Sequence, residues 1–189
     1  MGNREDLLAG ARRCLEETGY LRTTVRDIAT ASKVSMAAIG YHFGSREVLL
    51  NQALFAAMDE WAAGSGRLAG QGDTARERYA DTWDRKIRDF RETGWLWTAS
   101  VEAFVHAQSS PELLAIIAEG QRHNRRMVAA QLRGVPQDEV AEEDVRALGS
   151  VHIALLTGVM VQVLTDPEHA PNGHEIAQGL RAMAELLES

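Results

Sequence analysis

Apolar residues recur along almost the whole chain at the three- and four-residue spacing that is typical of amphipathic helices. Strand-like alternation of Val, Ile and Thr is absent, and proline stands at only four positions. N-cap, glycine-stop and proline-start signals divide the pattern into nine predicted helices. These cover roughly residues 4–18, 25–32, 36–43, 46–61, 74–92, 95–108, 111–133, 142–165 and 173–187. The sequence therefore predicts an all-α fold.

Two of the predicted helices near the N-terminus are short and are joined by a tight turn around Lys33. Thr24 and Ser35 precede them at N-cap positions, where a side-chain oxygen can accept from a free backbone amide. Four apolar residues are spaced to pack the two helices on each other: Ile28, Ala29, Val34 and Ile39. This is the pattern of a helix-turn-helix, whose second helix can enter the major groove of DNA.

The charge distribution supports a separate N-terminal module. The whole chain carries a formal charge of −7, which by itself argues against nucleic-acid binding. Residues 1–55, however, hold seven basic and six acidic residues, whereas residues 56–189 hold thirteen and twenty-one. A slightly basic module therefore precedes an acidic body, and the distribution of charge matters more than its sum.

The segment from Thr24 to Leu50 resembles the TetR family of bacterial repressors. The resemblance rests on V-R-D-I-A at 25–29, V-S at 34–35, Y-H-F-G-S-R-E at 41–47 and L-L at 49–50. It implies a nine-helix TetR-like fold, with a helix-turn-helix domain at residues 1–50 and a ligand-binding and dimerisation domain at 51–189. It also implies that Thr24, Ser35, Tyr41, His42 and Arg46 face DNA phosphates.

Side-chain chemistry suggests how such a module would contact a duplex. Arg26, Lys33 and Arg46 can neutralise phosphates, while Tyr41 and His42 can donate hydrogen bonds to them. Base reading would fall to Arg26, which can make a bidentate contact with guanine, and to the small or apolar start of the second helix. The apolar residues at that start are Met36, Ala37 and Ala38.

Two positions depart from the family pattern. Lys33 stands where the family usually has glycine, at a turn position that tends to need a left-handed backbone. Either Lys33 adopts that conformation with strain, or the turn has another shape. Gly40 stands where the family often has tyrosine, so one phosphate contact should be missing, and glycine weakens the helix by roughly 1 kcal/mol relative to alanine.

The last two predicted helices carry more apolar surface than one chain can bury. The helix at 142–165 is apolar nearly all round, and such a helix must be covered on most sides. We therefore predict a homodimer in which these helices form a four-helix bundle, the alternative being that they are internal core. The predicted interface residues are Leu148, Leu155, Val159, Val163, Ile176, Leu180, Met183 and Leu187.

The central helices are rich in aromatic and polar side chains. All four tryptophans lie outside the N-terminal module. Apolar walls with a few polar groups suit a small organic effector, although each residue taken singly could be ordinary core. We expect effector contacts from Trp83, Phe90, Trp95, Trp97, Glu102, Phe104, His106, Met127, His152 and Gln162. The histidine spacing does not indicate a metal site, and no cofactor is expected.

The predicted function is a ligand-responsive regulator, most simply a repressor, that binds a palindromic double-stranded operator. Effector binding would shift the helix that begins at Arg46 and change the separation of the two DNA-binding heads. The alternatives are an activator, or a helical enzyme or carrier that uses the aromatic region without DNA. Glu102 and His106, four residues apart, are the nearest to an acid–base pair.

The single cysteine, Cys14, cannot form an internal disulfide, which favours a reducing compartment. The N-terminus lacks a basic start followed by a long apolar run, and the apolar stretch at 153–164 is short and interrupted by polar residues. We therefore expect a cytoplasmic protein without membrane attachment.

Overall fold

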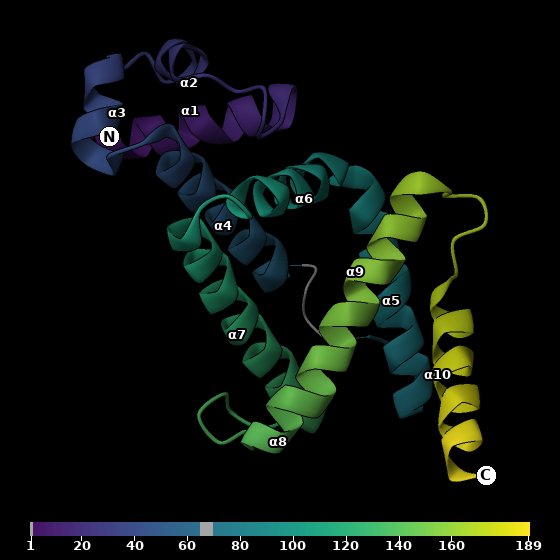
Figure 1. Cartoon of the computed structure of the whole chain (residues 1–189). Helices are drawn as coiled ribbons and strands as arrows, with labels where there is room; N and C mark the ends of the chain where they lie inside the picture. Colours follow the sequence, from purple (N-terminus) through teal and green to yellow (C-terminus); the bar gives the residue numbers. More distant parts are fainter. Residues whose placement is uncertain (1, 65–69) are drawn as a thin grey trace. The chain divides into compact units, whose positions relative to one another are not determined.

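A computed structural model describes residues 2–64 and 70–189 of the chain, and in these ranges it contains helices and no β-strand (Figure 1). The all-α prediction is confirmed. The helices are α1 (Asn3–Thr18), α2 (Val25–Ser32), α3 (Met36–Phe43), α4 (Arg46–Gly64), α5 (Ala75–Glu92), α6 (Gly94–Ala107), α7 (Pro111–Arg133), α8 (Glu142–Asp144), α9 (Ser150–Thr165) and α10 (Gly173–Glu188). A π-helical turn, Val145–Gly149, joins α8 to α9, so the predicted helix at 142–165 is one helical segment with an altered second turn.

The chain packs as two compact units. The first contains Met1–Ala62 and Thr93–Ala118, and the second contains Ala63–Glu92 and Glu119–Ser189. Helix α6 thus packs with the N-terminal helices although it is distant from them in sequence. The predicted domain boundary at residue 50 separates a DNA-binding role from a ligand-binding and dimerisation role, and it does not coincide with the division into these two units. The boundary stays a prediction.

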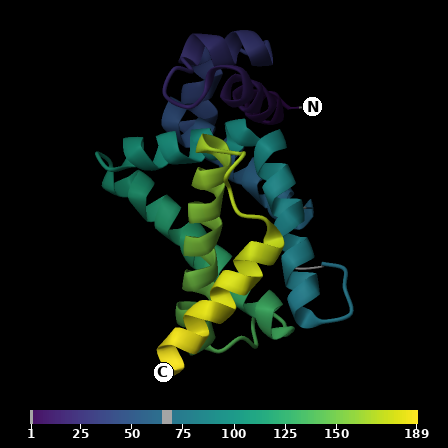
Figure 2. The same cartoon turned by 90° about the vertical axis from the view of Figure 1, so that its right-hand side faces the viewer.

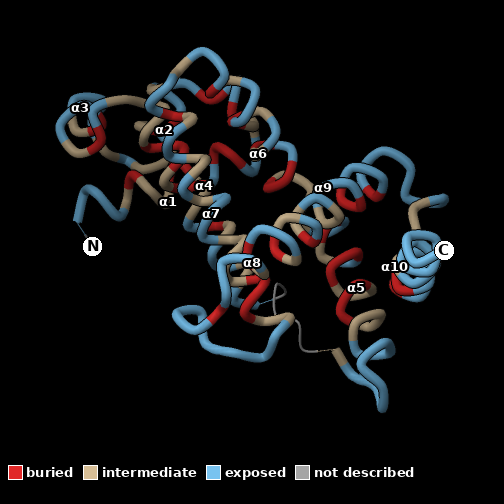
Figure 3. The backbone as a smooth tube through the Cα atoms, turned by 60° about the horizontal axis from the view of Figure 1, so that its bottom comes forward, coloured by how far each residue is buried: buried red, intermediate tan, exposed pale blue. Residues whose placement is uncertain are grey.

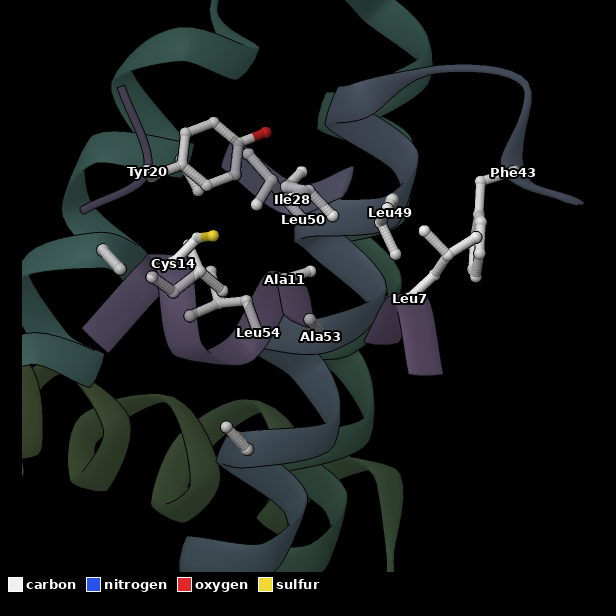
Figure 4. Close-up of a cluster of buried hydrophobic side chains, with 14 of the residues drawn as sticks. Leu7, Ala11, Cys14, Tyr20, Ile28, Phe43, Leu49, Leu50, Ala53 and Leu54 are labelled. Carbon is white, nitrogen blue, oxygen red and sulfur yellow. The ribbon is translucent and has the colours of Figure 1, made fainter. Parts of the chain in front are cut away.

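The core of the first unit lies between α1, α2, α3, α4 and α6 (Figure 4). Leu7, Ala11 and Leu15 project from one face of α1 because they recur at helical spacing. They meet Ile28 of α2 together with residues of the other helices, and every labelled side chain in Figure 4 is buried: Leu7, Ala11, Cys14, Tyr20, Ile28, Phe43, Leu49, Leu50, Ala53 and Leu54. Cys14 is buried among these side chains as a small core residue, and this burial raises the pKa of its thiol.

In the second unit α5 packs against both α9 and α10 (Figure 1). After α9 the chain turns back through residues 166–172, and α10 runs in the opposite sense (Figure 2). The Gly173 amide donates to the Asp84 carboxylate over 2.7 Å, and a Cβ at Gly173 would lie 1.9 Å from the Ala80 carbonyl oxygen. Glycine is therefore needed where α10 begins against α5.

Helix α9 has an inner and an outer face, and this corrects part of the predicted dimer surface. Val159 and Val163 of α9 and Ile176 of α10 are buried inside the chain. A helix that is apolar all round gives no signal of which side packs internally, so periodicity alone could not separate the two faces. Leu148, Leu155 and Leu180 are half-buried, whereas Met183 and Leu187 are exposed.

The outer face of α9 is apolar and uncovered in the single chain (Figure 3). Five of its exposed positions follow the alternating spacing of three and four residues of a helix-packing seam: Val151, Ala154, Gly158, Val161 and Thr165. By length and composition alone, Glu142–Thr165 would also be apolar enough to cross a membrane. The inner face nevertheless packs on α5, so this helix belongs to the fold of the second unit.

Two glycines offer a test of the packing between α1 and α2. A Cβ at Gly10 would lie 2.7 Å from Ser32 Cβ and 2.8 Å from the Ser32 backbone nitrogen, whereas a Cβ at Gly40 would meet nothing within 4 Å. We expect Gly10→Ala to lower the free energy of unfolding by about 1–3 kcal/mol through overpacking. Gly40→Ala should raise it by about 1 kcal/mol through helix propensity. Urea unfolding of both variants measures the difference, and equal effects would contradict the close approach of α1 to α2.

Candidate nucleic-acid interface and effector residues

The start of α2 is fixed by a capping box, as predicted for Thr24. The Thr24 hydroxyl accepts from the Asp27 amide over 3.2 Å, and the Asp27 carboxylate accepts from the Thr24 amide over 2.8 Å. Hydrogen bonds from the Thr24 side chain and backbone hold the pKa of Asp27 below its ordinary value. The cap therefore sets both the start and the direction of α2.

The turn between α2 and α3 takes the shape that a glycine would usually provide. Lys33 adopts a left-handed backbone with φ 58° and ψ 29°, and among the described residues it is the one non-glycine residue with positive φ. The amides of Lys33 and Val34 then bond to Thr30 and Ala29 carbonyls at 3.3 and 3.2 Å. The conformation costs about 1 kcal/mol, but it closes α2 and places the Lys33 side chain in solvent.

Most of the predicted DNA contacts are exposed residues of α2, the turn and α3, and we refer to these residues together as a surface. Met36 and Tyr41 are 56% and 86% exposed, which is unusual for such large side chains. Tyr41 packs edge-on against the half-buried His42 ring, with centroids 4.9 Å apart. The other exposed members of this surface are Thr24, Arg26, Lys33, Ser35 and Ala37, and Ala38 is half-buried.

Ser35 differs from Thr24 in its role. It stands in extended backbone before α3, but its side chain makes no capping hydrogen bond. The first amides of α3 therefore lack a side-chain cap. An uncapped helix N-terminus presents free N–H groups and a partial positive charge, which is the arrangement that favours a phosphate.

Arg46 is placed differently from the expectation that it faces a phosphate. Its guanidinium is largely enclosed, and it donates to the backbone carbonyls of Tyr20 and Thr23 and to the Glu47 carboxylate, the last over 2.9 Å. Burial alone would raise the pKa of Glu47, but bonds from its own amide and from Arg46 hold that pKa below its ordinary value. The sequence identified Arg46 as a cation, but it gave no sign that the carbonyls of Tyr20 and Thr23 lie beside its guanidinium.

The loop between α1 and α2, residues 19–24, is held from a second side by α6. The Glu102 carboxylate accepts from the amides of Tyr20 and Leu21 at 2.7 and 3.2 Å. Gly19 has φ +86°, and a Cβ there would lie 3.1 Å from Glu102 Oε2. Glu102, predicted as an effector contact, thus bonds to the backbone that leads into α2, a connection between residues some 80 positions apart.

The predicted effector residues divide between the two units. On α6, in the first unit, Trp97 is buried and packs edge-on against Trp61, while the ring of the half-buried His106 lies 5.9 Å from the Tyr20 ring. Trp95 is half-buried, and Phe104 is exposed. In the second unit Trp83, Phe90 and His152 are buried, Met127 is half-buried and Gln162 is exposed.

A buried lysine that the sequence reasoning missed lies in the same part of the second unit. Lys86 is 3% exposed, and burial lowers its pKa to about 8. His152 is buried close to it, and burial together with the Lys86 charge lowers the His152 pKa to about 4. Lys86 stands three residues after Trp83 and four before Phe90, so helical spacing could have placed it on the same face.

Two models of protein families match this chain. The model for bacterial regulatory proteins of the tetR family matches residues 7–53, and the model for the tetracyclin repressor-like C-terminal domain matches residues 74–186. The chain belongs to the TetR family. The matches place the helix-turn-helix in the N-terminal family domain and α5 to α10 in the C-terminal one.

Relatives in the TetR family include repressors from two bacterial groups. The repressor AcnR of Corynebacterium efficiens is 45% identical over 49 residues, which make up 26% of each chain. The match therefore spans about a quarter of that relative's length. The repressor NicS of Pseudomonas putida is 27% identical over 142 residues, which cover 72% of this chain and 67% of NicS. The family and these relatives are transcriptional regulators rather than enzymes.

Solved structures share the TetR fold over nearly the whole chain. A transcriptional regulator from Rhodococcus sp. Rha1 superposes with a TM-score of 0.68 at 19% identity, covering 94% of each chain. GusR of Salmonella enterica gives a TM-score of 0.65 at 20% identity, covering 96% of this chain and 92% of GusR. Regulators of this family bind operator DNA and small-molecule effectors as dimers.

The hydrogen bonds from Arg46 and Glu102 to the α1–α2 loop should contribute to the stability of the protein. We expect Arg46→Ala and Glu102→Ala each to lower the free energy of unfolding by about 1–3 kcal/mol, because each leaves loop backbone groups without a partner. The double variant should lose less than the sum, since both side chains hold the same loop. Denaturant unfolding of the four proteins measures this coupling.

Arg122→Ala is a suitable control, because Arg122 pairs with Glu119 on the surface of α7 and should contribute less than about 1 kcal/mol. Strictly additive losses for the Arg46 and Glu102 variants would show that the two side chains act separately.

Proposed function

We propose that this protein is a cytoplasmic, dimeric repressor that binds a palindromic operator through α3 and releases it when a small organic effector binds. The observation that supports this most directly is the exposed surface of α2, the turn and α3. This surface combines the uncapped N-terminus of α3, two exposed cations and an exposed tyrosine with an α2 helix whose start is fixed by the Thr24 capping box.

The members of this surface divide into phosphate contacts and base contacts. Lys33 and Tyr41, with the free amides at the start of α3, are suited to phosphates, which fix position without reading sequence. Arg26 can read guanine, and Met36 and Ala37 can contact thymine methyl groups. Arg46 acts indirectly, because it holds the carbonyls of Tyr20 and Thr23 next to the Thr24 cap.

The outer face of α9 supports the dimer. Apart from Gln162, the exposed residues of α9 from Val151 to Thr165 are apolar or small, and α10 adds exposed Met183, Leu186 and Leu187. Covering this surface with a second copy would form a two-fold bundle of four helices. A two-fold dimer also matches a palindrome whose half-sites lie about 34 Å apart.

Helix α6 supports a route from an effector to the DNA-reading helices within the first unit. Any displacement of α6 acts on the α1–α2 loop through Glu102, and the same loop carries the Thr24 cap of α2. An effector can use this route only if it binds the released arrangement better than the DNA-bound one.

The DNA-binding proposal is tested by anisotropy titration of a duplex selected from random sequences, at several salt concentrations. We expect Tyr41→Phe to weaken binding to specific and random duplexes alike, by about 1 kcal/mol, because it removes one hydrogen bond. Arg26→Ala should cost about 1–3 kcal/mol on the specific duplex and relax base preference at one position.

Arg122→Ala, far along the chain on α7, should leave both affinities unchanged. If Arg26→Ala lowered the affinity for specific and random DNA equally, Arg26 would not be a residue that reads bases. The repressor proposal itself fails if the wild-type protein binds no duplex at low salt, including the DNA upstream of its own gene.

The dimer proposal is tested at Gly158, where an added Cβ meets nothing within 4 Å in the single chain. We expect the Gly158→Arg variant to fold normally and yet to sediment as a monomer, because the arginine side chain would clash with the facing helix of the second copy. Gly2→Arg, another glycine with open space around it, should remain dimeric. A Gly158→Arg protein that sediments as the wild type would place the dimer contact elsewhere.

A further inference from the structure

Helix α3 has a buried face and an exposed face. Ile39 and Phe43 are buried in the core of the first unit. Four exposed residues share one continuous arc on the rest of the helix, since successive residues turn by a constant angle. We call them the outer face of α3: Met36, Ala37, Gly40 and Tyr41. The first turn is the part of a recognition helix that meets base edges, and here it presents Met36 and Ala37.

The outer face lacks the side chains that usually read bases. The sequence of α3 is M-A-A-I-G-Y-H-F, which holds no Arg, Lys, Asn, Gln, Asp, Glu, Ser or Thr. Those residue types pair with the donors and acceptors of base edges in the major groove. Tyr41 can hydrogen-bond, but it stands more than one turn after Met36 and packs edge-on against the His42 ring. The first turn of α3 is therefore an apolar surface.

Met36 is the largest apolar group of this turn. Its side chain is 56% exposed. A Cβ added at Gly40, one turn further along the outer face, would meet nothing within 4 Å, so no other part of the described chain covers the helix there. The unbranched thioether side chain of methionine adapts to irregular apolar surfaces. Met36 and the methyl group of Ala37 can therefore follow the contour of an apolar partner.

The chemistry of the bases selects the partner of such a turn. Thymine offers a methyl group in the major groove, whereas guanine, adenine and cytosine offer only donors and acceptors there. Met36 placed against those polar groups would displace their water without replacing its hydrogen bonds, which costs free energy. Contact with a thymine methyl group removes apolar surface from water on both sides. The turn therefore favours thymine by attraction and disfavours the other bases by leaving their polar groups unpaired.

We propose that α3 recognises its operator chiefly through thymine methyl groups, with Met36 and Ala37 in contact with thymines of two neighbouring base pairs. Arg26 of α2, which is exposed, adds a contact suited to guanine. This inference rests on the proposed operator binding. It adds the class of sequence that is bound, namely a half-site with thymines at the positions that the first turn of α3 faces.

The test uses the full-length protein and the duplex selected from random sequences. Each thymine of one half-site is replaced in turn by deoxyuridine, which lacks only the 5-methyl group, and the affinity is measured by anisotropy. We expect about a fourfold loss at each of two neighbouring positions, because each replacement removes a methyl group from an apolar contact. A half-site without thymines, or one in which no replacement weakens binding by more than about twofold, would overturn the proposal.

Variants assign the contact to Met36. Met36→Ala should bind thymine and deoxyuridine alike at one of the two positions and keep the difference at the other, which Ala37 faces. Arg26→Ala should keep both differences, since it reads another base. Ile116→Ala, which shortens a 40% exposed side chain on α7, is the control and should behave as the wild type. A folded Met36→Ala protein that keeps the full loss at both positions overturns the proposal, and the deoxyuridine scan of the wild type decides it without any variant.

Operator binding and thymine reading can fail separately. If the wild type binds the selected duplex and deoxyuridine has no effect, the repressor proposal stands and the thymine reading is wrong. If the wild type binds the duplex and the scan shows two sensitive thymines, one of them dependent on Met36, both proposals hold. If the wild type binds no duplex at low salt, both are wrong.

Discussion

The geometry of the N-terminal helices depends on how the α1–α2 loop is held. The carboxylate of Glu102 takes two of its backbone amides, and the guanidinium of Arg46 takes two of its carbonyls. Backbone groups in a loop that packs against helices must find partners, and here side chains of α6 and α4 provide them. Because the loop ends at Thr24, these bonds also fix where α2 begins.

This arrangement separates two kinds of contribution to DNA recognition. Residues on the exposed surface, such as Tyr41 and Arg26, can touch a duplex directly. Arg46 and Glu102 lie behind that surface and determine its shape. The αL conformation of Lys33 belongs to both groups, since its backbone sets the angle between α2 and α3 while its side chain points to solvent. Strain at this position is offset by the bonds that close α2.

The sequence predicted the helices and the helix-turn-helix well, because both rest on local signals. The Thr24 N-cap could be read from the residues around it, whereas the left-handed option at Lys33 came from the resemblance to the TetR family. The partners of Arg46 and Glu102 could not be predicted, since the loop they hold is 26 and about 80 residues away in sequence. The two faces of α9 were indistinguishable for a related reason: every side of the helix is apolar, so only packing on α5 reveals which one is internal.

Helix α9 has two faces with different surroundings. Its inner face brings His152 to Tyr79 of α5, and its outer face, from Val151 to Thr165, is left for a second copy of the chain. A helix packed on both sides cannot shift toward one without changing its contacts with the other, because protein interiors are densely packed. The π-helical turn at Val145–Gly149 lies at the start of this helix, where Gly149 sits so close to the Arg125 carbonyl that a Cβ would lie 2.3 Å from its oxygen. That contact holds the start of α9 against α7. A movement of α9 would therefore displace mainly the residues beyond this turn, and these are the residues that carry the proposed dimer seam.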